Sequence, residues 1–225
     1  ITFVSSGGGT NAISSLLEVP GASNTILESY IPYSKDSMDK FLNRKPDHYC
    51  SLDTCLSMGA NAYKKSKEID TQTKSKYLLG LSITANLATT YEKKGDHKFF
   101  IVIQANDYTT YLECFLEKGK RSRNEEEELI TACAISLLAE SCGLEYPLPD
   151  QAENINIEKI IAEKPWKKLF NNKVGFISNN KSNPELIFPG SFNPLHEGHI
   201  KMKELAERKT GMHTTFEICA KNADK

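Results

Sequence analysis

The sequence predicts an α/β protein built from two unequal units. Apolar segments of strand and helix type alternate along the chain, and the composition changes near residue 146. The 225 residues are 39% hydrophobic and 25% charged, as in an ordinary globular protein. Because 28 Lys and Arg face 29 Asp and Glu, no charge excess favours nucleic acid as a partner. Apolar runs such as 99–103 are too short to cross a bilayer, so no membrane partner is expected either.

The first unit, residues 1–146, is expected to begin with a strand at 1–4 and a glycine-rich turn at 5–10. A helix follows that turn, with Ile13, Leu16 and Leu17 on one side. A second helix begins after Ser51, whose hydroxyl is a suitable N-cap. Its apolar face repeats at helical spacing through Leu52, Cys55, Leu56, Gly59, Ala62 and Tyr63.

Three strands and a helix complete this unit. The strands are expected at 77–84, 99–105 and 109–116, and Asn106-Asp107 predicts a hairpin between the last two. A final amphipathic helix has the acidic run Glu125–Glu128 in its first turn, where the helix dipole favours negative charge. Its apolar face consists of Leu129, Ile130, Cys133, Leu137 and Leu138.

Residues 147–184 are rich in Pro, Asn and Lys, which predicts a linker with a short helical segment at 155–161. Trp166 is expected to dock this linker onto a neighbouring element. A second unit, residues 185–225, then has a strand at 186–188, a loop, a helix at 196–208 and a strand at 214–219. The order predicts a β-α-β unit.

Six cysteines are scattered along the chain without a Cys-x-x-Cys pair, at positions 50, 55, 114, 133, 142 and 219. This spacing matches neither a zinc site nor a disulfide scaffold, so we expect free, mostly buried thiols and no metal site. The chain shows no signal peptide, and a cytoplasmic location is expected.

The most specific motif in the chain is Gly-Ser-Phe-Asn-Pro-Leu-His-Glu-Gly-His, residues 190–199. Gly190 lets the backbone approach a ligand just after a strand, and Gly198 leaves room beside the following helix. His196 and His199 lie in the first helical turn, where unpaired amides and the dipole attract phosphate. An isolated His-x-x-His would more often be two surface histidines or a metal pair.

The complete motif resembles the signature of the nucleotidylyltransferase superfamily. The form found here is closest to the nicotinate or nicotinamide mononucleotide adenylyltransferases and to the phosphopantetheine adenylyltransferases. The resemblance implies a Rossmann-like fold, ATP and Mg²⁺ as substrate and ion, no tightly bound cofactor, and a mononucleotide or other phosphate-bearing acceptor. It implies catalytic roles for His196 and His199, and a nucleotide site lined by Gly190, Ser191, Phe192 and Gly198. Only residues 185–225 match, so we expect a partial domain of a longer protein.

The glycine-rich segment Ser5-Ser6-Gly7-Gly8-Gly9-Thr10 joins a strand to a helix, where backbone amides often hold phosphate. No Gly-Lys-Ser/Thr follows, so it is not a Walker A motif, and it lacks the dinucleotide fingerprint. Taken alone, three glycines predict a tight turn more often than a ligand site.

Residues 1–142 as a whole resemble the C-terminal domain of competence-damage-inducible (CinA) proteins. The segments that carry the resemblance are 5–10, Val19-Pro20-Gly21-Ala22-Ser23, Tyr33-Ser34 and Met58-Gly59-Ala60. It implies a three-layer α/β/α domain that can assemble into a homo-oligomer and that hydrolyses the amide of nicotinamide mononucleotide. The implied pocket contains Ser5 as the serine, Tyr33 as the tyrosine, Gly8 and Gly9, and the nucleotide-holding Arg123.

Several residues depart from the CinA pattern. Met38 stands at the family's lysine position, and a methionine can neither donate a proton nor activate a serine. Val4 replaces an acidic residue, and 82–87 replaces a glycine-containing loop. Glu127 and Glu128 lie where a second family arginine is expected, and their charge would repel a phosphate. We therefore expect a CinA-like domain that has lost its amidase chemistry.

Three functions follow from these patterns. The first is a nucleotidylyltransferase of pyridine-nucleotide (NAD) metabolism, with the CinA-like domain as a degenerate accessory. The second is a non-catalytic module for nucleotide binding or oligomerisation, and the third is a working nicotinamide-nucleotide amidohydrolase.

Overall fold

The computed structural model describes residues 1–91, 93–151, 154–179, 183–192 and 194–219. The chain folds into two compact units, Ile1–Ala162 and Glu163–Lys225. The units are described separately below.

In the described part of the first unit, six strands form one mixed sheet in the order β2-β1-β3-β4-β5-β6. The strands are β1 (Thr2–Ser6), β2 (Glu28–Tyr30), β3 (Gly80–Asn86), β4 (His97–Gln104), β5 (Tyr108–Leu116) and β6 (Ile155–Ile161). β1 pairs parallel with β2 and β3, and the remaining neighbours pair antiparallel. Parallel β1, β2 and β3 place the loops that follow them at one end of the sheet.

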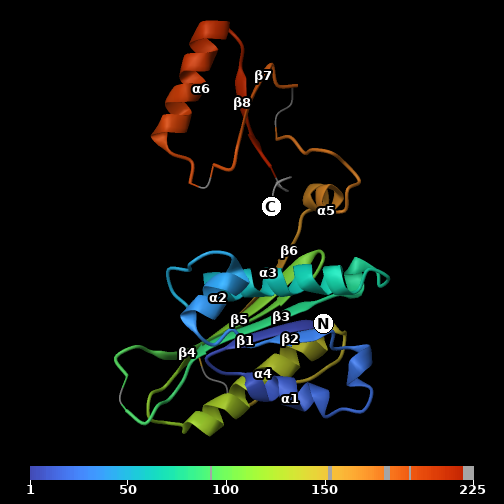
Figure 1. The fold of residues 1–225 in the computed structure, drawn as a ribbon, viewed down its shortest axis with the longest axis vertical. Coiled ribbons are helices and arrows are strands. Elements are labelled where there is room, and N and C mark those ends of the chain that lie inside the picture. Colours follow the sequence, from blue (N-terminus) through green and yellow to red (C-terminus); the bar gives the residue numbers. More distant parts are fainter. Residues whose placement is uncertain (92, 152–153, 180–182, 193, 220–225) are drawn as a thin grey trace. The chain divides into compact units, whose positions relative to one another are not determined.

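Helices cover both faces of this sheet. α1 (Thr10–Leu17) and α4 (Arg123–Ser141) lie on one face, and α2 (Lys35–Leu42) and α3 (Leu52–Ile69) lie on the other (Figure 1). Two short 3₁₀ turns, η1 (Ala22–Asn24) and η2 (Ser75–Tyr77), lie in connections. The predicted three-layer α/β/α architecture is confirmed.

Alternating strand residues build a core on each face of the sheet. Phe3 and Ile101 belong to the cluster that also contains buried residues of α1 and α4. Their neighbours Val4 and Val102 are fully buried in separate clusters with residues of α2 and α3. Both faces of the sheet are therefore apolar and covered by helices.

Serine caps set the start of three helices. Ser51 Oγ accepts a hydrogen bond from the Thr54 amide at 3.3 Å, as its position in the sequence predicted. Ser34 caps α2 in the same way, and Ser122 forms a reciprocal capping box with Glu125 at the start of α4. The acidic run 125–128 lies in the first turns of α4, as expected.

The predicted hairpin is confirmed, because β4 and β5 pair antiparallel and Gln104 lies opposite Thr109. The strand predicted at 77–84 begins later, at Gly80, because 75–77 form the turn η2. The expectation that 155–161 is helical is wrong. These residues form β6, which adds to the free edge of β5, since the β-branched Ile155, Ile157, Ile160 and Ile161 favour a strand once a partner is available.

In the second unit, α5 (Lys164–Phe170) comes first and a β-α-β unit follows: β7 (Leu186–Gly190), α6 (Glu197–Thr210) and β8 (Thr214–Ile218). β7 and β8 pair parallel, with Phe188 opposite Phe216. The ring of Trp166, 45% exposed, stacks on Phe170 within α5.

All six cysteines are free thiols, as predicted. Cys55, Cys114 and Cys133 are buried, whereas Cys142 and Cys219 are exposed, contrary to the expectation that most would be buried. Burial raises the pKa of the Cys55 and Cys133 thiols to about 12, so neither is a reactive thiolate. Among the described residues, no helix is long and apolar enough to span a membrane.

Candidate functional site

The glycine-rich turn between β1 and α1 is tightly built. Gly7 and Gly9 have φ values of 81° and 84°, which favour glycine, and a Cβ on Gly7 would lie 2.0 Å from the Ala85 carbonyl oxygen. Ser5 is fully buried, and its hydroxyl donates a hydrogen bond to the Gly8 carbonyl. The residue at the family's serine position is therefore shielded from solvent.

The carboxylate of Glu127 lies on the amides at the start of α1. Gly9 N–H donates to Glu127 Oε2 at 2.8 Å, while Asn11 N–H and the Thr10 hydroxyl each donate to Oε1 at 3.2 Å. These are the donors that would hold a phosphate at a helix N-terminus. Glu127 therefore occupies that position itself, in addition to bringing the reversed charge that the sequence indicated.

The other residues of the implied amidase pocket are separated. Met38 is 1% exposed and packs in the core with Val4 and Met58, so the family's lysine position faces the protein interior. Tyr33 is 72% exposed. Arg123 does approach the glycine-rich turn, because its guanidinium donates to the carbonyls of Gly7 and Ala88, each at 3.2 Å.

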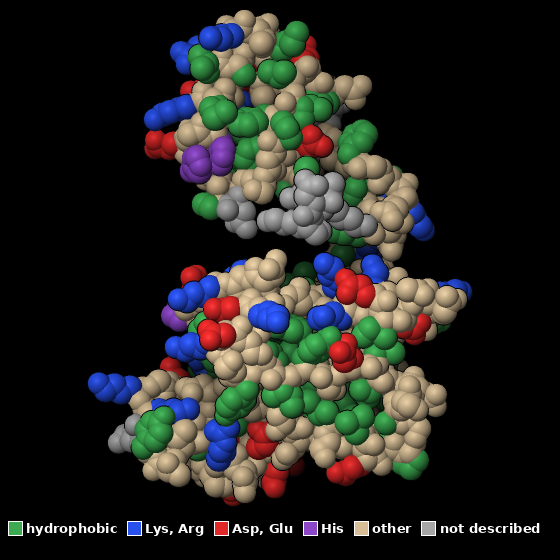
Figure 2. Space-filling view, in the orientation of Figure 1, with side chains coloured by type: hydrophobic (Ala, Val, Ile, Leu, Met, Phe, Trp, Pro, Cys, Tyr) green, Lys and Arg blue, Asp and Glu red, His purple; other side chains and the backbone are tan. Residues whose placement is uncertain are grey.

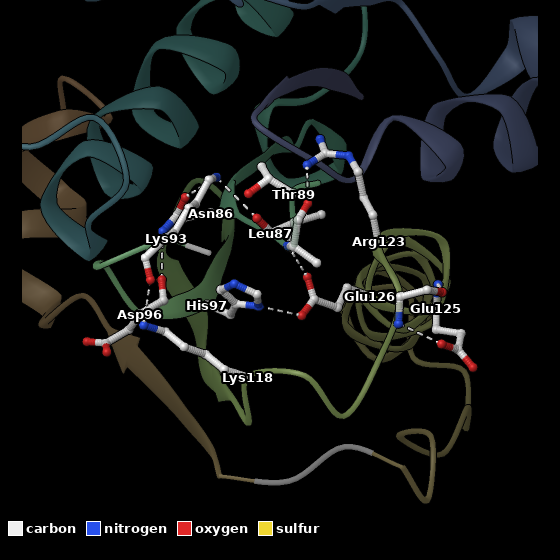
Figure 3. A network of polar contacts seen from close by, with 12 residues as sticks. Asn86, Leu87, Thr89, Lys93, Asp96, His97, Lys118, Arg123, Glu125 and Glu126 are labelled. Carbon is white, nitrogen blue, oxygen red and sulfur yellow. Dashed lines mark hydrogen bonds and ion pairs between the residues drawn. The ribbon is translucent and has the colours of Figure 1, made fainter. Parts of the chain in front are cut away.

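A second polar group near this end of the sheet was missed in the sequence. Glu126 is fully buried, and its two oxygens contact His97 Nδ1 at 2.8 Å and the Ala88 amide at 2.6 Å (Figure 3). The acidic run in the sequence predicts only a helix start. Nothing local indicates that Glu126 turns inward to meet a histidine 29 residues away.

The second unit places the two motif histidines side by side. His196 is the N-cap of α6 and His199 lies in its first turn, and their rings stack with centroids 3.8 Å apart. Histidine side chains are visible at the surface of this unit in Figure 2, in purple. His199 therefore lies in the first turn of a helix as predicted, whereas His196 directly precedes that turn as its N-cap.

A backbone amide contacts the Nδ1 atom of each of these two histidines. His196 Nδ1 accepts from the Gly198 amide at 3.1 Å, and His199 Nδ1 accepts from the His196 amide at 3.4 Å. A neutral imidazole that accepts at Nδ1 carries its proton on Nε2. Both Nε2–H groups are then hydrogen-bond donors, for which an anion is a suitable acceptor.

A cavity of about 450 Å³ lies beside the two histidines. Its lining residues are Phe188, Pro189, Gly190, Ser191, Phe192, Pro194, His196 and His199. Phe192 has a positive φ of 44°, and its ring meets His199 edge-on with centroids 5.1 Å apart. A Cβ on Gly190 would lie 2.7 Å from the Phe192 ring, so a larger residue there would displace that ring.

The sequence-predicted residues Gly190, Ser191, Phe192, His196 and His199 therefore converge on one cavity. Gly198 is adjacent, in the first turn of α6, and a Cβ there would lie 3.0 Å from the His196 ring. Asn193 of the motif lies outside the described residues. The described residues contain no group of three or more His, Cys, Asp or Glu positioned to hold a metal ion.

The first unit belongs to the class of three-layer α/β/α folds with a mixed sheet. Within that class, its fold is similar to that of solved structures of CinA superfamily proteins. A competence or damage-inducible protein from Enterobacter asburiae superposes with a TM-score of 0.50 and 13% identity, over 62% of this chain and 86% of that chain. A CinA superfamily protein from Enterobacter cloacae superposes with a TM-score of 0.50 and 11% identity, over 62% and 80%. At such identities the likeness shows the fold alone. No protein-family model and no curated protein matches the sequence.

Proposed function

We propose that this protein is a nucleotidylyltransferase-type protein of pyridine-nucleotide metabolism, which transfers adenylyl from ATP to a mononucleotide or another phosphate acceptor. The observation that carries the proposal is the stacked pair His196 and His199, whose Nδ1 atoms are both held by backbone amides. This arrangement leaves two Nε2–H donors at the N-terminus of α6, beside a cavity.

In the proposed reaction, a phosphate oxygen of the acceptor attacks the α-phosphorus of ATP. The bond from that phosphorus to the bridging oxygen breaks, and pyrophosphate leaves with the bond's electron pair. Negative charge grows on the non-bridging and leaving oxygens, which donors already in place stabilise. His196 and His199 supply those donors in the proposal. Mg²⁺ would arrive with the ATP phosphates and neutralise part of their charge.

The loop before α6 provides the remaining contacts of the proposed site. Gly190 and Ser191 offer backbone at the end of β7, and Phe192 closes one wall against His199. Gly198 keeps the first turn of α6 free of a side chain. These residues position the nucleotide and do not react.

Within this proposal the CinA-like unit is a non-catalytic accessory. An amidase of the family type needs an exposed nucleophile, a base and oxyanion donors together. Here Ser5 is buried, Met38 lies in the core, and Glu127 covers the amides of the glycine-rich turn. Those three observations argue against the amidohydrolase and favour a unit that contributes structure, including self-association.

The test is pyrophosphate release by the full natural protein with ATP, Mg²⁺ and nicotinamide mononucleotide or another mononucleotide. We expect release that falls strongly in His199→Ala and is unchanged in His48→Ala, which alters an exposed histidine of the other unit. Equal release by both variants would exclude His199 from the site.

The same samples are assayed for ammonia from nicotinamide mononucleotide. Ammonia release that disappears in Ser5→Ala would support the amidohydrolase in place of the accessory role. Because the two products differ, the two functions are tested separately.

A further inference from the structure

The first unit contains a second cavity, of about 670 Å³, and of its lining residues only Arg123 was predicted from the sequence to hold a ligand. Three segments line it: the loop after β3, the start of β4, and the connection from β5 to α4. The lining residues are Ala88, Thr89, Thr90, Tyr91, Lys93, His97, Lys118, Gly119, Arg121, Ser122 and Arg123. The volume is that of a typical small-molecule site.

The lining of this cavity carries positive charge. Lys93, Lys118, Arg121 and Arg123 all contribute, and no Asp or Glu is among the described lining residues. A concave surface lined by charges of one sign concentrates ions of the opposite sign. The chain as a whole has a net charge of −1, so the positive charge at this cavity is a local feature of its surface.

Two of these cations are held in place without being neutralised. Lys93 Nζ donates to Asn86 Oδ1 at 2.8 Å and to the Leu87 carbonyl at 3.1 Å. Lys118 Nζ donates to the carbonyls of residues 93 and 94, at 3.0 and 3.2 Å. Each ammonium has three N–H groups, so one is left on each. Within the described residues, neither lysine forms an ion pair with a carboxylate.

His97 lines this cavity, and the buried carboxylate of Glu126 holds its ring in place. The side chain of His97 is 9% exposed, and the Glu126 carboxylate accepts from its Nδ1 at 2.8 Å. A carboxylate acceptor requires the proton on Nδ1, so Nε2 is the nitrogen left for another partner. The second Glu126 oxygen holds the Ala88 amide, which ties the loop after β3 to α4 (Figure 3).

We propose that this cavity binds a small phosphate-bearing molecule, with Lys93 and Lys118 contacting the phosphate and Glu126 positioning His97 against it. The site is distinct from the glycine-rich turn, whose residues 5–10 do not line the cavity and whose amides are occupied by Glu127. It does not depend on the proposed adenylyl transfer, which uses the other unit. A volume of about 670 Å³ matches a small ligand and not a nucleic-acid strand.

The test measures binding of inorganic pyrophosphate and of AMP by calorimetry, in the full chain carrying His199→Ala so that the other site is removed. Lys93→Gln and Lys118→Gln keep an N–H donor for the neutral carbonyl partners but remove the charge. We expect each to weaken binding about tenfold or more, because a charge-assisted hydrogen bond is lost. Lys64→Gln, on the exposed side of α3, is the matched control and should bind as the parent does.

A second measurement keeps the test valid if a lysine variant loosens the loop. The imidazole nitrogen signals of His97 are followed by NMR in the parent protein, and pyrophosphate should shift Nε2 more than those of His48. Pyrophosphate and AMP that fail to bind at millimolar concentration would overturn the proposal. Undiminished binding in the Lys93→Gln, Lys118→Gln double variant would also overturn it, as would binding of single-stranded oligonucleotide without binding of AMP.

Discussion

In the part of the chain that the structure describes, α1 and α6 each begin just after a strand and a glycine-containing loop, and their N-termini are occupied differently. At α1 the amides of Gly9 and Asn11 donate to the Glu127 carboxylate from α4. At α6 the caps are the neutral acceptors His196 and His199, which are exposed and half-buried. A helix N-terminus is therefore a site for an anion only where the protein has not already supplied one.

The largest expected effect comes from placing the family's lysine in the first unit with Met38→Lys, in α2. Met38 is 1% exposed in an apolar cluster, so the new ammonium would be buried without a partner. We expect a loss of about 3–5 kcal/mol in the free energy of unfolding, measured in urea, and no gain of amidase activity. Met38→Leu is the control and should cost less than about 1.5 kcal/mol. A Met38→Lys variant that is as stable as the wild type and releases ammonia from nicotinamide mononucleotide would contradict this prediction.

At the α6 side, His196→Ala and His196→Asn separate catalysis from capping. Both should lower the rate of pyrophosphate release by about 10²- to 10³-fold, the usual effect of losing one donor that stabilises charge in the transition state. Alanine also removes the Nδ1 acceptor of the Gly198 amide and should cost about 1 kcal/mol of stability, whereas asparagine is itself a good N-cap. Thermal unfolding of the two variants measures this difference in stability. Equal rates of pyrophosphate release by His196→Asn and the wild type would show that His196 does not take part in the reaction.

Opening the α1 site is the third way to sharpen the comparison. Glu127→Ala leaves three donors without their acceptor and should cost about 1–3 kcal/mol. Added phosphate should then raise the melting temperature of the variant, because it binds the exposed amides in the folded state. Glu128→Ala, at the exposed neighbouring position, should show neither effect. A Glu127→Ala protein as stable as wild type would mean that the carboxylate does not fill the site.

The smallest effect concerns acid pH in the second unit. The Thr214 amide, as the main cause, with Lys203 and His213 nearby, lowers the pKa of Glu207 below its usual value. The native state thus favours the charged carboxylate, and this stabilisation is present above the ordinary pKa of 4.5 and is lost as the pH falls through the lowered value. The protection of the Thr214 amide against hydrogen exchange, taken relative to the intrinsic exchange rate at each pH, should fall over that range. Glu207→Gln should remove the pH dependence, and Glu204→Gln should retain it.

Local patterns predicted what is determined locally. The Ser51 cap, the Asn106-Asp107 hairpin and the His196–His199 turn each depend on residues within a few positions of one another. β6 was misread because seven residues such as 155–161 become a strand only when the distant edge of β5 is present. Propensity alone does not reveal that partner.

The candidate sites divide in the same way. The cavity beside His196 follows from one continuous motif and could be located in advance. The His97–Glu126 pair and the placement of Glu127 over Gly9 join residues 29 and 118 positions apart. Contacts of that range depend on how α4 packs against the sheet, which no sequence period encodes.

The position of β6 has a mechanical consequence for the chain. A single residue, Ala162, separates the end of this edge strand from the second unit, so a pull on that unit loads the pairing of Ile161 with Tyr108 first. Antiparallel pairs loaded at one end open one after another, as a zipper does. The seven residues of β6 would then lengthen the tether by about 23 Å, at about 3.3 Å per residue, while β1 to β5 stayed paired. Detachment of the edge strand would thus add length to the tether between the two units without disturbing the rest of the sheet.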